Sequence, residues 1–322
     1  MLLLSLGFGF LFVAALPDKA RRAHQEAREA RRGAGGIEES SAGWHRNSLV
    51  SGQAELADDG AADLVRGDVT EAFSRVYSKH MWGQSGRGSG EGSTINATAI
   101  MRKVLTQFIQ DKDLSIMVDA PNGGMVWTDV FLNDSWHGAN GMSLKYIGLD
   151  VVPSVIAGNH ARHAADIREK RISIGQVDVT KPKSLSAAVR KGLKNVGITE
   201  SAWRQRAFLL TRDVVQHWPW SLACTYLRTV LREKALLPRY LLVGGYRHKQ
   251  LKNRDIPLGG YFPVDLSQNP FKLPPPAQIL RDTPNGEGGS GKLLRVWDLD
   301  AIPEEFVAES VCNSSIHSQT RL

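Results

Sequence analysis

Cysteine is scarce in this sequence, with only Cys224 and Cys312 among 322 residues. Two cysteines cannot build the set of disulfides that holds together a small secreted domain. Neither cysteine lies in a Cys-x-x-Cys motif or a Cys/His cluster. The sequence therefore predicts no structural zinc site and no other metal site.

Compositional bias and internal repeats are also missing. The chain contains 31 Gly and 14 Pro, with 42% hydrophobic and 23% charged residues. These values are ordinary for globular proteins and exclude a collagen-like, coiled-coil or wholly disordered chain.

The first 16 residues contain no charged side chain, and Ser5 is their only polar one. A bilayer span needs about 20 apolar residues, so residues 1–16 are typical of a signal peptide or a short signal anchor. No Lys or Arg precedes this segment, whereas six lie between Lys19 and Arg32. The positive-inside rule then predicts a membrane anchor at residues 2–16 in an endomembrane, with the folded domain in the cytosol. The alternatives are entry into the secretory pathway or an organelle.

The composition divides the rest of the chain into three parts. Residues 17–71 are rich in Ala, Arg, Glu and Gly and predict a disordered or partly helical tether. Residues 72–306 carry the folding signals, and residues 307–322 predict a flexible tail. Residues 1–71 contain 8 Lys and Arg residues and 11 Asp and Glu residues. The whole chain has 40 and 33, so residues 72–322 contain 32 basic and 22 acidic residues. This basic excess is scattered and does not favour nucleic-acid binding.

Short apolar runs separated by helix-like stretches indicate the fold class. The runs are residues 116–118, 146–149, 172–177, 208–210 and 240–243. Continuous apolar strands are buried on both faces, as in a parallel sheet covered by helices. Helices are predicted at residues 94–110, 153–163, 184–193 and 221–234. Residues 292–299 predict a further strand, with 261–266 as its antiparallel partner. The prediction is a Rossmann-like α/β fold with a seven-stranded, mostly parallel sheet, a terminal antiparallel hairpin and helices on both faces.

An aspartate ends or follows each of the first four runs, namely Asp119, Asp150, Asp178 and Asp213. Each could be a turn or capping residue if taken singly, but ligands of doubly wound sheets bind at this edge. Asp119 begins a turn whose glycines allow a ligand to approach the backbone. Asp150 is placed to accept hydrogen bonds from a ribose diol. The absent G-x-G-x-x-G motif disfavours NAD and leaves a nucleoside ligand without pyrophosphate, such as S-adenosylmethionine.

Several longer motifs follow one another in the folded part. They are Phe73-x-x-Val76-Tyr77, Trp82-Gly83, Ser89 to Ser93, Asp119 to Trp127, Tyr146 to Asp150, Asp178 to Thr180, and Thr211-Arg212-Asp213-x-x-x-His217. In this order they resemble the class I S-adenosylmethionine-dependent methyltransferases. More narrowly, they are similar to a group of largely uncharacterised methyltransferase-domain proteins of bacteria and algae, over about residues 72–305.

The resemblance implies a seven-stranded fold with S-adenosylmethionine as cofactor over the strand tips. The implied activity is methylation at an oxygen of a small-molecule or glycan acceptor. The cofactor-binding positions are Asp119, Ala120, Pro121, Gly123, Trp127, Asp150, Val151, Asp178, Val179 and Arg212. Asn122 replaces the family's cysteine, and Gly124 replaces its acidic residue. These departures motivate an alternative, a degenerate methyltransferase fold that acts as a binding or scaffold protein.

Asp213 and His217 are the candidate catalytic residues. They are four positions apart and would share one face if this stretch were helical. Histidine can take a proton near neutral pH, with the aspartate orienting it. The alternative is structural, with Asp213 in an ion pair with Arg212 and His217 capping a packed helix. The candidate walls of the acceptor pocket are Trp82, Tyr77, Tyr246 and Tyr261, for which core packing is the alternative.

Asn96, Asn133 and Asn313 each begin an Asn-x-Ser/Thr sequence. This pattern is common by chance. It has a chemical consequence only if the chain enters the lumen of the secretory pathway.

Overall fold

Five parallel strands form the centre of the sheet, and each overlaps one of the predicted apolar runs. They are β1 (Ile116–Asp119), β2 (Lys145–Asp150), β3 (Ile172–Gln176), β4 (Ala207–Thr211) and β5 (Tyr240–Tyr246). The order across the sheet is β3-β2-β1-β4-β5-β7-β6. The chain winds outward from β1 to β3 and then returns to the other side of β1 as β4. This reversal makes β1 and β4 the switch point, where α/β sheets bind their ligands.

An antiparallel hairpin completes the seven-stranded sheet, as predicted. It consists of β6 (Gln278–Arg281) and β7 (Lys292–Asp298), and β7 pairs with β5. The prediction that residues 261–266 pair with β7 was wrong, since this segment is a loop. Strand β6 lies at the sheet edge and buries only Leu280, so it has no apolar run to reveal it.

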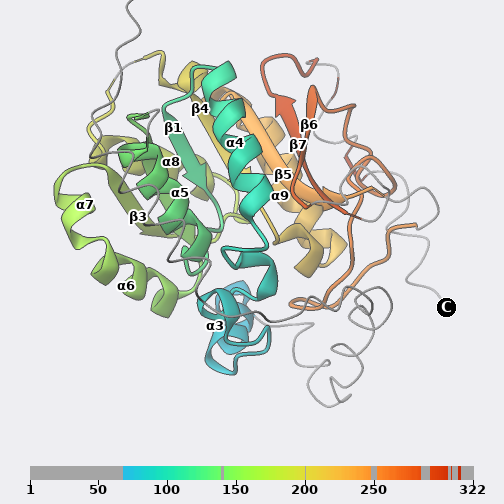
Figure 1. Cartoon of the computed structure of the whole chain (residues 1–322). Helices are drawn as coiled ribbons and strands as arrows, with labels where there is room; N and C mark the ends of the chain where they lie inside the picture. The colour runs from blue at the N-terminus through green and yellow to red at the C-terminus, as the bar shows by residue number, and fades with distance from the viewer. Residues whose placement is uncertain are drawn as a thin grey trace, which may run out of the picture. The chain divides into compact units, whose positions relative to one another are not determined.

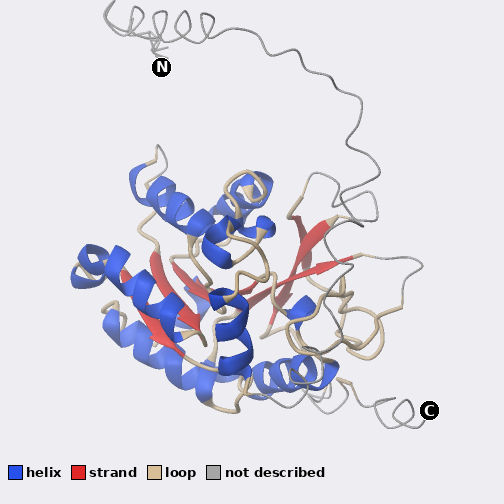
Figure 2. Cartoon of the chain, turned by 90° about the horizontal axis from the view of Figure 1, so that it is seen from below, coloured by secondary structure: helices blue, strands red, loops and turns tan. Residues whose placement is uncertain are grey.

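Helices cover both faces of the sheet (Figures 1 and 2). Side chains of α3 (Val69–Ser78), α8 (Ser184–Asn195) and α9 (Trp220–Arg232) belong to one hydrophobic cluster. Side chains of α4 (Ala99–Asp111) and α5 (Val126–His137) belong to a second, together with Ile156 of α6 (Pro153–Arg162). Ile167 of the short α7 (Ala164–Arg168) packs against the second cluster. Short 3-10 turns lie at Ser85–Gly88, Glu91–Ser93, Trp203–Arg206, Val215–His217 and Lys234–Leu236.

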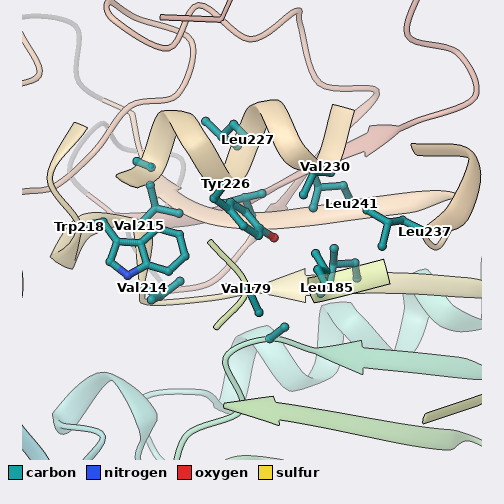
Figure 3. Close-up of a cluster of buried hydrophobic side chains, with 14 of the residues drawn as sticks. Val179, Leu185, Val214, Val215, Trp218, Tyr226, Leu227, Val230, Leu237 and Leu241 are labelled. Carbon is teal, nitrogen blue, oxygen red and sulfur yellow. The ribbon is translucent and has the colours of Figure 1, made fainter. Parts of the chain in front are cut away.

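Helix α9 illustrates how the sequence pattern produces this packing. Its buried residues Ala223, Tyr226, Leu227 and Val230 recur at a spacing of three or four, which places them on one face. Figure 3 shows this face turned toward the strands. The Tyr226 hydroxyl is hydrogen-bonded to the hydroxyl of Thr211 at the end of β4. The helix is therefore held by an apolar stripe and one buried polar contact.

The structure describes residues 68–138, 141–199, 201–247, 252–283, 291–303, 306 and 311–312. The predicted segment 1–16 and nearly all of the tether lie outside these ranges, and α3 begins at Val69, within the predicted tether. In the described part of the chain, no helix is long and apolar enough to cross a membrane. Two residues of the predicted flexible tail, Val311 and Cys312, are buried. At these positions the structure differs from that prediction, because Cys312 forms a disulfide with Cys224 of α9.

Candidate functional site

A cleft of about 850 Å³ lies at the carboxyl ends of β1, β2 and β4, beside the residues that follow β3. Most of the residues predicted to bind the cofactor line it: Asp119, Pro121, Gly123, Trp127, Asp150, Val151, Asp178, Val179 and Arg212. Trp82 and Asp213 line it as well. Ala120, His217, Tyr246 and Tyr261 lie outside this lining. The strand ends therefore meet at one cavity. Of the predicted acceptor-pocket residues, Trp82 and Tyr77 line this cavity, and Tyr246 and Tyr261 lie outside its lining.

Asp150 ends β2 and holds the turn that follows β1. Its carboxylate accepts hydrogen bonds from the backbone N–H of Gly123 (2.9 Å) and of Val152 (3.0 Å). Burial raises the pKa of Asp150, although these N–H groups favour the charged form. A buried carboxylate held by backbone donors has a fixed orientation. It can offer its remaining lone pairs to hydroxyl groups in the cleft.

Asp119 ends β1 and is 2% exposed. The Tyr146 hydroxyl donates a hydrogen bond to its Oδ2 atom (2.9 Å). Burial raises the pKa of Asp119 to about 7, although the Tyr146 hydrogen bond and the nearby charge of Arg212 oppose the shift. Asp119 can therefore gain or lose a proton near neutral pH, and a cationic group in the cleft would favour its charged form.

Asn122 lies in the turn after β1 and lines the cleft with a side chain that is 5% exposed. Its backbone N–H donates to the carbonyl of Leu149 on β2 (2.9 Å). Neither Oδ1 nor Nδ2 of its amide forms a hydrogen bond of ordinary geometry in the described part of the chain, although the amide lies near enough to the Tyr146 hydroxyl to lower the pKa of Tyr146. A buried amide without partners is costly, so both atoms are suited to pair with a ligand.

Residues 85–93, a Ser/Gly-rich stretch before α4 that we call the covering segment, lie over this turn. The Ser89 hydroxyl accepts a hydrogen bond from the Gly124 N–H and is hydrogen-bonded to the Tyr77 hydroxyl, both at 2.9 Å. A Cβ atom at Gly123, where φ is +53°, would lie 2.7 Å from the Ser89 hydroxyl oxygen. Glycine is therefore needed here both for the backbone conformation and for the close approach.

The departure at Gly124 has a packing explanation. A Cβ atom at this position would lie 2.8 Å from Arg87 Cβ and 2.8 Å from the carbonyl oxygen of Gly86. The Arg87 guanidinium donates to the Gly124 carbonyl (2.8 Å) and to Asp129 of α5 (2.6 Å). The acidic residue of the family pattern would thus collide with the covering segment. Here Asp129, in the first turn of α5, supplies a nearby carboxylate.

Beyond β3, Asp178 acts as a turn residue as well as a cleft residue. Its Oδ1 atom accepts hydrogen bonds from the backbone N–H and the hydroxyl of Thr180. The cleft is apolar on this side, where Val151, Val177 and Val179 line it. Val179 belongs to the cluster that also contains Trp218 (Figure 3). This wall can receive a flat apolar ring.

Asp213 follows β4 in the left-handed region (φ +55°), and only Val215–His217 form a 3-10 turn, so the condition that Asp213 and His217 share one helix is not met. Its carboxylate lies 3.2 Å from the Arg212 guanidinium and accepts hydrogen bonds from Lys292 Nζ (2.8 and 2.9 Å). Burial opposes ionisation, but the charges of Arg212 and Lys292 outweigh it and hold the pKa of Asp213 far below its usual value. Arg212 also binds Asp282 through two hydrogen bonds of 2.9 Å. Asp213 therefore belongs to a balanced ion cluster, in agreement with the structural alternative.

His217 lies between two of the predicted acceptor-pocket residues. Its ring centroid is 4.5 Å from that of Trp82 and 5.6 Å from that of Tyr261. Its Nδ1 atom is 2.7 Å from the Gly260 carbonyl, which can only accept a hydrogen bond. Nδ1 is therefore the donor, and Nε2 is left as the basic nitrogen. Burial lowers the pKa of His217 to about 4, against the opposing effects of the Gly260 hydrogen bond and the Asp213 charge.

The aromatic group continues to Tyr246, whose hydroxyl is 2.9 Å from that of Tyr261. The structure thus brings Trp82, Tyr246 and Tyr261 together with His217, and of these only Trp82 reaches the cleft lining.

Sequence reasoning assigned no role to Ser89 or Lys292, and it named Tyr77 only as a candidate wall of the acceptor pocket. Tyr77 and Ser89 lie inside the motifs that carried the resemblance, which was a usable signal. Lys292 follows Asp213 by 79 residues, and no local pattern joins them. Among the described residues, no group of three or more His, Cys, Asp or Glu side chains is arranged to hold a metal ion.

Comparisons with known proteins give only distant structural likenesses. No family model matches the chain, and no curated protein matches it. A solved structure described as TnmH is 15% identical, with 87% of this chain and 68% of that chain covered and a TM-score of 0.42. The methyltransferase domain of bacterial CtHen1-C is 14% identical, with 63% and 97% covered and a TM-score of 0.40. The chain spans 42% of a structure described as a pericyclic reaction enzyme, at 12% identity and a TM-score of 0.36.

Proposed function

We propose that this chain is an S-adenosylmethionine-dependent methyltransferase that transfers a methyl group to an oxygen of a small molecule or glycan. The observation that carries the proposal is the hydrogen bond between the Asp150 carboxylate at the end of β2 and the Gly123 N–H in the turn after β1, at the sheet's switch point. There a fixed carboxylate faces a cleft, and a glycine lets a ligand approach the backbone. This is the arrangement that a ribose diol requires.

The other cleft residues fit the remaining parts of this cofactor. The wall formed by Val151, Val177 and Val179 suits the adenine ring. The unpaired amide of Asn122 offers one donor and one acceptor, which complement the carboxylate and the ammonium of an amino acid. Asp119 offers a carboxylate whose charged form is stabilised by a cation.

The acceptor is proposed to bind on the side of Trp82. The bound cofactor would supply an electrophilic methyl group for an in-line substitution. The chain's own residues would align the acceptor and take its proton. His217 Nε2 is the proposed proton acceptor, because Nδ1 is committed to Gly260 and the low pKa leaves the ring neutral at pH 7. The negative charge of nearby Asp213 favours the protonated ring once it forms.

The first experiment is a calorimetric titration of the full chain with S-adenosylmethionine and S-adenosylhomocysteine. We expect both to bind. Absence of binding at millimolar ligand would refute the proposal.

A second experiment separates an enzyme from a binding protein. The chain is incubated with methyl-labelled cofactor and with fractionated small molecules and glycans, and label transfer is counted beside the His217→Gln variant. Transfer by the parent chain alone supports the enzyme. Cofactor binding without transfer to any fraction would favour the degenerate-fold alternative.

A further inference from the structure

Both cysteines of the chain are buried and joined to each other. Cys224 lies in α9 and is 1% exposed, and Cys312 lies 88 residues later and is 3% exposed. Their Cα atoms are 6.1 Å apart, within the usual range for a disulfide. The link joins the end of the folded part to a helix that packs on the sheet.

The segment around Cys312 is seated by contacts other than the disulfide. The Arg228 side chain of α9 donates a hydrogen bond to the Val311 carbonyl (3.0 Å), and the Cys312 N–H donates to the Pro270 carbonyl (3.1 Å). Val311 is fully buried in the same hydrophobic cluster as α9. These contacts hold Cys312 beside Cys224 independently of the bond between them. The pairing is thus a feature of the folded chain.

Disulfides persist in oxidising compartments and are rare in the cytosol. A buried, fully paired set of cysteines therefore indicates that this domain folds on the lumenal or external side of a membrane. This is the opposite side from the one that Lys19 and the following arginines predict.

A second observation bears on the same compartment. Asn96 of the Asn96-Ala97-Thr98 sequence is exposed, in the turn that precedes α4. Its neighbour Ile95 is 44% exposed, an apolar side chain that a carbohydrate could shield. The hydroxyl of each described acceptor sequence is buried: Thr98 donates to the carbonyls of Thr94 and Ile95, and Ser135 donates to that of Phe131. The two asparagines differ in their backbone, since Asn133 lies within helix α5 and Asn96 lies in a turn. Asn96 is thus the better-presented asparagine.

We propose that the domain matures in the lumen of the secretory pathway, with the Cys224–Cys312 disulfide formed and an N-linked oligosaccharide on Asn96. In the first reaction the two thiols lose two protons and two electrons to the disulfide of a thiol oxidoreductase, which becomes a dithiol. In the second, the Asn96 amide nitrogen bonds to the anomeric carbon of a lipid-pyrophosphate-linked oligosaccharide. The amide loses a proton and the lipid pyrophosphate leaves.

The test is cell-free translation of the full chain with and without endoplasmic-reticulum microsomes. We expect a protease-protected product that is heavier by an oligosaccharide and loses this mass on endoglycosidase treatment. Asn96→Gln should abolish the shift, whereas Thr98→Ser, which keeps the acceptor sequence and the buried hydroxyl, should retain it. An unshifted product that is digested by added protease would overturn the lumenal placement.

Matched variants decide the site and the disulfide. A shift that survives Asn96→Gln but is lost in Asn133→Gln or Asn313→Gln would overturn the assignment to Asn96. The microsomal product, denatured without reductant, should not react with a maleimide polymer, and after reduction it should gain two adducts. Two adducts before reduction would overturn the disulfide. None of these outcomes depends on cofactor binding.

Discussion

Asp150→Ala is the most direct test of the proposed cofactor site. The side chain is 4% exposed, and its two oxygens accept the Gly123 and Val152 N–H groups. Removing it leaves two buried donors without a partner, at a cost in the free energy of unfolding of ~1–3 kcal/mol each. It also removes the charged acceptor proposed to bind the ribose hydroxyls.

A hydrogen bond to a charged group contributes ~1.5–3 kcal/mol. At 1.36 kcal/mol per factor of ten, losing one such bond predicts an affinity for S-adenosylhomocysteine that is about 10- to 150-fold weaker. The assay is isothermal titration calorimetry at 25 °C, with thermal unfolding measured in parallel. Unfolding reports the loss of stability, and calorimetry reports the loss of affinity.

Asp265→Ala is the matched control. Asp265 is also a buried carboxylate that accepts a backbone hydrogen bond, from the Ser267 N–H, but it does not line the cleft. We expect this variant to lose stability while it binds S-adenosylhomocysteine like the parent chain. If Asp150→Ala binds within about threefold of the parent, or if both variants weaken binding equally, Asp150 does not contact the ligand.

Four further predictions follow from individual contacts. Asn122→Ala should weaken the binding of S-adenosylhomocysteine by about 10- to 150-fold, the effect of losing one hydrogen bond to a charged group. It should leave the binding of 5′-methylthioadenosine, which lacks the amino-acid end, unaffected in the same titration; equal losses would contradict pairing with that end. His217→Gln should lower kcat about 10²- to 10⁴-fold and leave the affinity for the cofactor unchanged. In the parent chain, kcat should fall only as the pH decreases toward about 4, where the histidine becomes protonated. A fall in kcat near pH 6.5 would point to a base with an unperturbed pKa. Calorimetric affinity for cationic S-adenosylmethionine should decrease as the pH falls through about 7, because protonation removes the charge of Asp119, and Asp119→Asn should bind weakly without this dependence. Cys312→Ser should lower the free energy of unfolding in urea by up to ~4–5 kcal/mol, the chain-entropy value for a loop of this length; an unchanged transition midpoint would show that the disulfide does not constrain the unfolded chain.

The central sheet could be predicted because its strands are buried on both faces. Strands β1 and β4 are buried at every position, so each appears in the sequence as an uninterrupted apolar run. Strand β6 buries only one of its four residues and has no such run. The loop at 261–266 was mistaken for a strand because Phe262, Val264 and Leu266 alternate as buried residues. Their alternation reflects packing against the hydrophobic cluster, not sheet pairing.

The cofactor side of the site was predictable for a geometric reason. Parallel neighbouring strands end at the same edge, so Asp119 and Asp150 had to lie near each other once β1 and β2 were recognised. The covering segment was harder, since Ser89 reaches Gly124 across 35 residues. Lys292 could not be anticipated at all. It approaches Asp213 only because β7 returns antiparallel beside β5.

The two candidate catalytic residues acquire different chemical properties from these long-range contacts. Asp213 and Asp282 together balance the charges of Arg212 and Lys292, so protonation of Asp213 would leave positive charge unbalanced, and its pKa is held too low for it to act as a base. His217 is half-buried and lies against Trp82 and Tyr261, and its pKa is lowered, so the ring is neutral and Nε2 has an open lone pair. In the proposed reaction, proton removal therefore falls to the histidine. The fixed negative charge of Asp213 then stabilises the imidazolium of His217. This electrostatic effect acts at a distance, so it does not require the two residues to lie on one face of a helix.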